Sequence, residues 1–176
     1  MKIDRSITVG RPRAEVYEFW RAFENFPRFM QHLKSVQVMD SAGNRSHWVA
    51  KAPLNNQVEW DSEIISDRPN EMIVWRSLPG SQIENGGTVR FDDAPGNRGT
   101  EVHVVMAYEP PGGEGAALLA RVLGEEPEKQ IHEDLRHFKQ IMEVGFVSTV
   151  YGQTSGRQDD VEKERATLSE NKETIR

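Results

Sequence analysis

Residues 128–147 read EKQIHEDLRHFKQIMEVGFV, and they carry the clearest helical pattern of the chain. Ile131, Leu135, Phe138 and Met142 follow one another at intervals of four, three and four residues, which places them on one face of a helix. Charged residues fill many of the remaining positions and can face water. The single apolar face of this long helix predicts that the helix covers a large sheet.

The sequence before this helix changes largely to the period of two that is typical of strands. A first strand is expected over residues 3–9, followed by a helix that begins near Pro12 and a helical turn over residues 26–30. A further helical segment is expected over residues 116–123. Between these helices we expect six strands joined by short turns, which favours antiparallel pairing. Their ranges are 35–40, 45–51, 57–66, 72–77, 88–92 and 100–108, and Gly86 and Gly87 are expected to form a turn.

This order of elements predicts an α+β fold of the helix-grip type, in which a curved antiparallel sheet of about seven strands wraps around the long C-terminal helix. A strongly curved sheet cannot contact a helix along its whole length, so a gap between them is expected. Residues 1–150 would form this ligand-binding domain. Residues 151–176 are rich in charge and poor in large apolar side chains, so a disordered tail is expected there.

Composition and charge exclude several classes of protein. The 176 residues include 22 Lys and Arg against 28 Asp and Glu, a net charge of −6 without a basic cluster, so no nucleic-acid partner is expected. The chain shows neither an apolar run long enough to span a membrane nor a secretory signal, so we expect a cytoplasmic protein without stable membrane insertion. The absence of cysteine excludes disulfides, thiolate-held zinc and a cysteine nucleophile.

Strand parity divides the predicted sheet into an inner, apolar face and an outer, polar face. The parity of residues 72–77 is ambiguous, which leaves either Trp75 or Arg76 to face inward. Large inward side chains either fill a core or line a cavity, and the two outcomes look alike in a sequence. The side chains that we expect to bind a hydrophobic ligand are Phe26, Phe29, Trp48, Trp60, Trp75, Phe91, Val104, Met106, Tyr108, Leu135, Phe138 and Met142.

Polar groups that could assist a reaction are few, and no catalytic residue or cofactor is assigned. Glu59 and Asp61 alternate with the inner set, which favours the solvated outer face. Asp134 lies beside the apolar stripe of the long helix, where it is either a buried acid, a partner of Arg76 or Arg90, or an exposed edge residue. The histidines lack the spacing of metal ligands and no G-x-S-x-G motif is present, so neither a metal site nor a serine nucleophile is expected.

Several short stretches of the chain resemble a known family. They are VYEFW at 16–20, ENFPRFM at 24–30, SHW at 46–48, EW at 59–60, IVWRS at 73–77, GTEV at 99–102, YEPPGG at 108–113 and DLRHFK at 134–139. Over about residues 3–157 the chain is similar to the bacterial cyclase/dehydrase branch of the START-like (SRPBCC) superfamily, which is related to polyketide cyclases and coenzyme Q-binding START proteins. The resemblance implies a helix-grip (Bet v 1-like) fold with a hydrophobic ligand cavity.

These observations favour a protein that binds a small hydrophobic or aromatic molecule, such as a lipid, quinone or polyketide, between the sheet and the helix at 128–147. A polyketide cyclase or dehydratase that uses the same cavity is the alternative. A third hypothesis is an adaptor whose charged C-terminal residues bind a partner. Both a monomer and a homodimer are compatible with the sequence.

Overall fold

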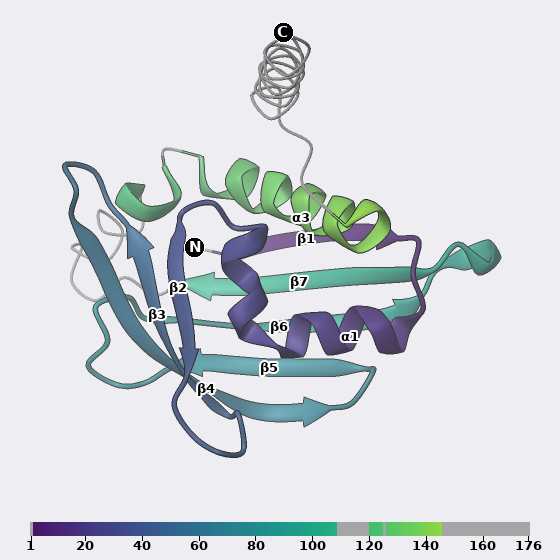
Figure 1. The fold of residues 1–176 in the computed structure, drawn as a ribbon, viewed down its shortest axis with the longest axis horizontal. Coiled ribbons are helices and arrows are strands. Elements are labelled where there is room, and N and C mark those ends of the chain that lie inside the picture. The colour runs from purple at the N-terminus through teal and green to yellow at the C-terminus, as the bar shows by residue number, and fades with distance from the viewer. Residues whose placement is uncertain (1, 109–119, 125, 146–176) are drawn as a thin grey trace, which may run out of the picture. The chain divides into compact units, whose positions relative to one another are not determined.

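Seven antiparallel strands form one curved sheet (Figure 1) in the order β1-β7-β6-β5-β4-β3-β2. The structure is a computed structural model, and it describes residues 2–108, 120–124 and 126–145. The first and second strands of the chain therefore form the two edges of the sheet. The strands are β1 (Lys2–Val9), β2 (Leu33–Val38), β3 (Arg45–Lys51), β4 (Gln57–Arg68), β5 (Met72–Ser77), β6 (Asn85–Asp93) and β7 (Thr100–Tyr108).

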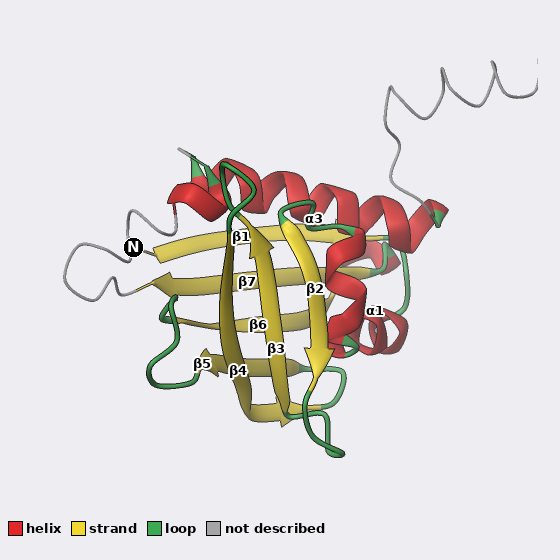
Figure 2. Ribbon diagram, turned by 60° about the vertical axis from the view of Figure 1, so that its left-hand side comes forward, coloured by secondary structure: helices red, strands yellow, loops and turns green. Residues whose placement is uncertain are grey.

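The helices pack along one side of this sheet (Figure 2). The long helix α3 (Pro127–Val144) contacts β1, the 3-10 helix η1 (Phe23–Arg28) contacts β2, and α1 (Arg13–Arg21) contacts β6. Proline in the first turn of α3 and Gly145 in a left-handed conformation (φ 88°) mark its two ends. Within the described residues, no helix has the length and apolar character needed to cross a membrane.

The helix-grip fold predicted from the sequence is confirmed, with shifts at the ends of several elements. The strand expected at 35–40 spans 33–38, the strand expected at 57–66 extends to Arg68, and the predicted turn at 26–30 lies in η1 at 23–28. Residues 120–123 are helical as expected. Three predicted segments lie outside the described residues: the start of that helix at 116–119, the end of the long helix at 146–147 and the tail at 151–176.

Gly86 and Gly87 correct one expectation, because the sequence alone suggests a turn where the structure has a strand. Both glycines pair with β5 and β7 inside β6, which therefore begins at Asn85 rather than at residue 88. A Cβ atom on Gly87 would lie 2.5 Å from Cζ2 of Trp75 and 2.6 Å from the carbonyl oxygen of Val105. Glycine is required at this strand position so that the Trp75 indole can lie against the backbone of β6.

A cluster of aromatic rings fills one part of the space between the sheet and α3. The ring of Phe138 is fully buried, and its centroid lies 5.2, 5.3 and 5.7 Å from those of Trp20, Phe29 and Phe19. Phe91 of β6 packs edge-on against Trp20 at 6.2 Å. These distances and tilted geometries are those of favourable aromatic pairs, so this part of the molecule is a packed core.

A polar network joins α1 to the far end of β4. Tyr17 donates a hydrogen bond from its hydroxyl to Oδ1 of Asp67 (2.5 Å), and Arg21 donates from Nε to Oδ2 (2.7 Å). Burial, together with the neighbouring carboxylate, raises the pKa of Tyr17 to about 12, so the phenol stays protonated and remains a donor. Arg21 also donates to the carbonyl oxygen of Gly43, which holds the β2–β3 turn against α1.

Candidate functional site

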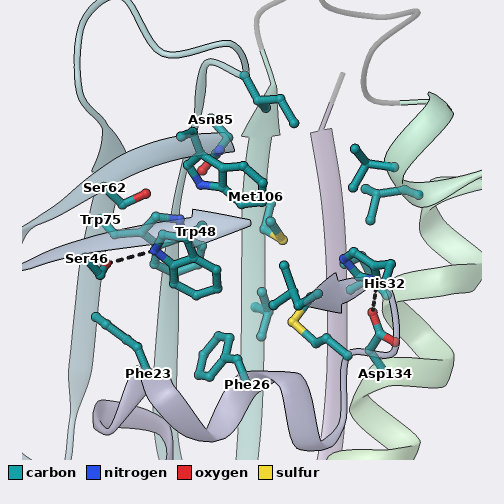
Figure 3. A pocket seen from close by; sticks show the side chains of 18 of the residues that line it. Phe23, Phe26, His32, Ser46, Trp48, Ser62, Trp75, Asn85, Met106 and Asp134 are labelled. Carbon is teal, nitrogen blue, oxygen red and sulfur yellow. Dashed lines mark hydrogen bonds and ion pairs between the residues drawn. The ribbon is translucent and has the colours of Figure 1, made fainter. Parts of the chain in front are cut away.

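A cavity of about 100 Å³ lies beside the aromatic cluster, between the sheet, η1 and α3 (Figure 3). Its wall is predominantly apolar and is built from α1 and η1, from the strands β2 to β7, from the helical residues 122–123 and from α3. The chain has four tryptophans, and all of them belong to this wall: Trp20, Trp48, Trp60 and Trp75.

Strand pairing brings two of these indoles together. Trp48 of β3 lies directly opposite Trp60 of β4, and their rings stack with centroids 5.9 Å apart and planes 15° apart. Nε1 of Trp48 donates a hydrogen bond to Oγ of Ser46 (2.8 Å), a buried hydroxyl on the same face of β3. Phe26 packs edge-on against Trp48 from the η1 side at 5.2 Å. The indole N–H is thus satisfied inside the protein, and flat apolar surfaces remain to face the cavity.

The structure places eight of the twelve predicted binding side chains in the cavity wall. They are Phe26, Phe29, Trp48, Trp60, Trp75, Val104, Met106 and Leu135. It also resolves the ambiguous parity of β5, because Trp75 lines the cavity whereas Arg76 forms an ion pair with Glu63 (2.7 Å) and is largely exposed. Contact between these eight wall side chains and a ligand stays a prediction.

Of the remaining four predicted side chains, three are not part of the cavity wall, and the fourth lies outside the described part of the chain. Phe91 and Phe138 lie on the expected inner faces but have no exposed surface, because α1 fills this end of the space and its rings pack onto both of them. Met142 is partly exposed, one turn of α3 beyond Phe138. Tyr108 ends β7, and its side chain lies outside the described part of the chain.

The other polar candidates lie on the outer face of the sheet, as strand parity indicates. His47 of β3 lies between two carboxylates of β4, with Nδ1 2.6 Å from Oδ1 of Asp61 and Nε2 3.5 Å from Oε2 of Glu59. Arg90 of β6 is 3.8 Å from Asp92. Exposed pairs of this kind contribute little to stability. None of these five residues is in the cavity wall.

Asp134 is the exception, because this acid is 2% exposed and belongs to the cavity wall. Its Oδ1 accepts a hydrogen bond from Nε2 of Gln130 (2.9 Å), one turn earlier in α3. Of the three possibilities that the sequence left open, the structure shows the buried acid. Burial raises the pKa of Asp134 to about 7, and the hydrogen bond from Gln130 opposes this rise.

His32 faces Asp134 from the segment between η1 and β2, with Nδ1 of the ring 3.7 Å from Oδ2 of the carboxyl group. Burial, helped by the positive charge of Lys51, lowers the pKa of His32 to about 4. Between pH 4 and 7 the two side chains are therefore predominantly neutral rather than an ion pair. The spacing of the histidines bears only on metal binding, and no spacing rule connects positions 32 and 134, so the sequence gives no sign of this pair.

A curved antiparallel sheet, closed by a long C-terminal helix around an apolar internal cavity, defines a protein of the helix-grip class. Residues 9–136 match the model of the family described as polyketide cyclase / dehydrase and lipid transport. The chain belongs to this family, as its resemblance to the START-like superfamily implies.

Similar proteins are known from several bacteria. A crystal structure of DR_A0006 from Deinococcus radiodurans is 38% identical, with a TM-score of 0.66 over 83% of this chain and 99% of that one. An uncharacterized 17.2 kDa protein from the melC2-rnhH intergenic region of Streptomyces lincolnensis is 28% identical over 81% of this chain and 89% of its own length. The Zhui aromatase/cyclase from Streptomyces sp. R1128 shares the fold, with a TM-score of 0.61 over 82% of this chain and 97% of that one, at 13% identity.

Proposed function

We propose that the protein binds a small hydrophobic or aromatic molecule in the cavity between the sheet and α3. The observation that carries this proposal is the wall itself, in which all four tryptophans meet the phenylalanines of η1 around an apolar space. Transfer of apolar surface out of water contributes about 25 cal/mol per Å², and a few polar groups then set the orientation of the ligand. Membership in a cyclase and lipid-transport family supports the same conclusion.

The size of the cavity bears on the size of the ligand. An apolar cavity of roughly 150 Å³ in another protein accommodates benzene, so the 100 Å³ seen here corresponds to about one small ring. A quinone, lipid or polyketide requires the wall to move outward. Phe26 lies on η1, a 3-10 helix of 6 residues, and a short segment opens at lower cost than a sheet or a long helix. We propose that η1 moves when a larger ligand enters.

The test of this function begins with protein purified from its native host. Native mass spectrometry before and after denaturing extraction is expected to reveal a stoichiometric apolar molecule. Trp60→Ala removes a large part of the wall and is expected to abolish co-purification, with the far-UV circular dichroism of the fold retained. Ile65→Ala, which changes an exposed side chain on the same strand, serves as the matched control. Unchanged co-purification with Trp60→Ala would contradict the proposed site.

The His32 and Asp134 pair favours a second candidate function, a polyketide cyclase or dehydratase. Such an enzyme removes a proton next to a carbonyl group or protonates a departing hydroxyl group. Near pH 6 a neutral imidazole can accept a proton and a protonated carboxyl group can donate one, and both side chains belong to the cavity wall. Turnover of a poly-β-ketone probe, measured by mass spectrometry and lost in His32→Gln and Asp134→Asn, would support the enzyme. Binding of the probe without turnover would leave the ligand-binding function.

A further inference from the structure

Two polar atoms in the cavity wall have no hydrogen-bond partner among the described residues, and they lie next to each other (Figure 3). They are Nδ1 of His32 and Oδ2 of Asp134, whose side chains are 12% and 3% exposed. Their separation of 3.7 Å is longer than the 2.7–3.2 Å of a hydrogen bond. Buried polar atoms are nearly always satisfied in folded proteins, so an unsatisfied adjacent pair that faces a cavity points to a ligand atom between them.

Hydrogen bonds hold the Asp134 side chain and the main chain that carries His32. Asp134 lies within α3 and accepts the hydrogen bond from Gln130, which leaves only Oδ2 directed at His32. The main-chain carbonyl oxygen of His32 accepts a hydrogen bond from the amide of Lys51 (2.8 Å), at the end of β3. Nδ1 of His137 lies 3.3 Å from the carbonyl oxygen of Phe29, which connects α3 to the segment that carries His32. These contacts fix the main chain on both sides of the 3.7 Å gap.

We infer that the ligand carries a hydroxyl group that bridges Nδ1 of His32 and Oδ2 of Asp134. This inference rests on the proposed function and names the polar group of the ligand. Because the two atoms are 3.7 Å apart, one oxygen atom can lie about 2.8 Å from both of them. A hydroxyl group has one proton to donate and lone pairs to accept, so it donates to one partner and accepts from the other. A methyl group in the same place does neither.

The charge state of the site favours a neutral hydroxyl over an anion. Burial disfavours both the carboxylate of Asp134 and the imidazolium of His32, so neither side chain supplies a charge to attract an ionised group near pH 6. The nearby charges that affect the pair have opposite signs: the positive charge of Lys51 affects His32, and the negative charge of Glu133 affects Asp134. An isolated carboxylate would lose its hydration in this apolar wall at large cost. The ligand class is therefore an apolar molecule with an alcohol or phenol group.

Phenol and toluene test the inference, because they have the same shape and differ only in a hydroxyl and a methyl group. Isothermal titration calorimetry at pH 6 is expected to show that the full-length protein binds phenol at least about tenfold more tightly than toluene. In the double variant His32→Leu/Asp134→Leu the order is expected to reverse, because the buried hydroxyl then lacks partners. Thr100→Val removes a buried hydroxyl that lies outside the cavity wall and is expected to leave the preference for phenol unchanged.

The outcomes separate this inference from the proposed function. Toluene binding as tight as phenol binding to the unmodified protein would overturn the inference and leave the apolar cavity as a binding site. A preference for phenol that survives in the double variant would overturn the assignment to this pair. Binding of neither probe would overturn both proposals. If the double variant does not fold, His32→Leu and Asp134→Leu are measured singly, and each is expected to reduce the preference for phenol.

Discussion

The pH dependence of stability gives the sharpest test of the buried pair. In the folded protein the pKa of Asp134 is raised from 3.8 to about 7, and the pKa of His32 is lowered from 6.5 to about 4. Between these values the folded state retains a proton on Asp134 that the unfolded chain has lost. The unfolded chain in turn carries a proton on His32 that the folded state excludes. The two effects on the unfolding free energy have opposite signs. Together they therefore leave it nearly independent of pH between pH 4 and 6.5.

Single substitutions separate the two effects. Stability falls with pH because of Asp134, so the unfolding free energy of Asp134→Asn is expected to rise relative to the unmodified protein as pH increases. Stability rises with pH because of His32. The unfolding free energy of His32→Gln is therefore expected to fall relative to that of the unmodified protein as pH increases. Each slope approaches about 1.4 kcal/mol per pH unit, which amounts to about 3 kcal/mol between pH 4 and 6.5.

Urea unfolding followed by far-UV circular dichroism at four pH values from 4 to 7 provides these differences, and each comparison at one pH cancels the contributions of all other groups. The double variant His32→Gln/Asp134→Asn is the control, in which the two slopes are expected to cancel. An ion pair would instead lower the pKa of Asp134 and raise that of His32. Neither slope would then appear in this range, and flat differences for both single variants would refute the neutral pair.

Three further predictions concern packing and hydrogen bonding, and each is checked by urea unfolding. Phe138→Ala removes a fully buried ring and is expected to lower the unfolding free energy by about 3–5 kcal/mol; a loss below about 1 kcal/mol would contradict its place in the core. Gly87→Ala is expected to be more destabilising than Gly86→Ala and to weaken ligand binding, because its methyl group displaces the Trp75 indole; equal effects would argue against that contact. Tyr17→Phe is expected to cost about 1 kcal/mol through loss of its hydrogen bond to β4, and an unchanged midpoint would show that the bond contributes nothing.

The architecture could be predicted because it depends on periodicity and order, which the sequence displays directly. The stripe of α3 and the alternation in β7 identify the faces that meet, and short turns between strands restrict the topology. The turn predicted at Gly86 and Gly87 is wrong, because glycine is frequent in turns but here lies inside a strand. Their actual role depends on the Trp75 ring of the neighbouring strand, and that contact is tertiary.

The candidate site could be predicted only in part, because parity identifies a face but not a position along it. Trp60 and Phe91 both lie on the inner face, yet α1 covers Phe91 and leaves Trp60 in the cavity wall. The location of α1 on β6 has no signal in the spacing of either residue. His32 was missed for a related reason, since its partner Asp134 follows about a hundred residues later and only the fold brings the two together.

The concentration of tryptophan in the cavity wall has an optical consequence. Since the chain has no fifth tryptophan, its entire indole fluorescence originates from residues that line one cavity. No emission from a distant indole dilutes the signal, and the stacked Trp48 and Trp60 are close enough to share their excitation. Occupancy of the cavity can therefore be followed by the intrinsic emission of the unlabelled protein, including in screens of compounds whose chemistry is not known in advance.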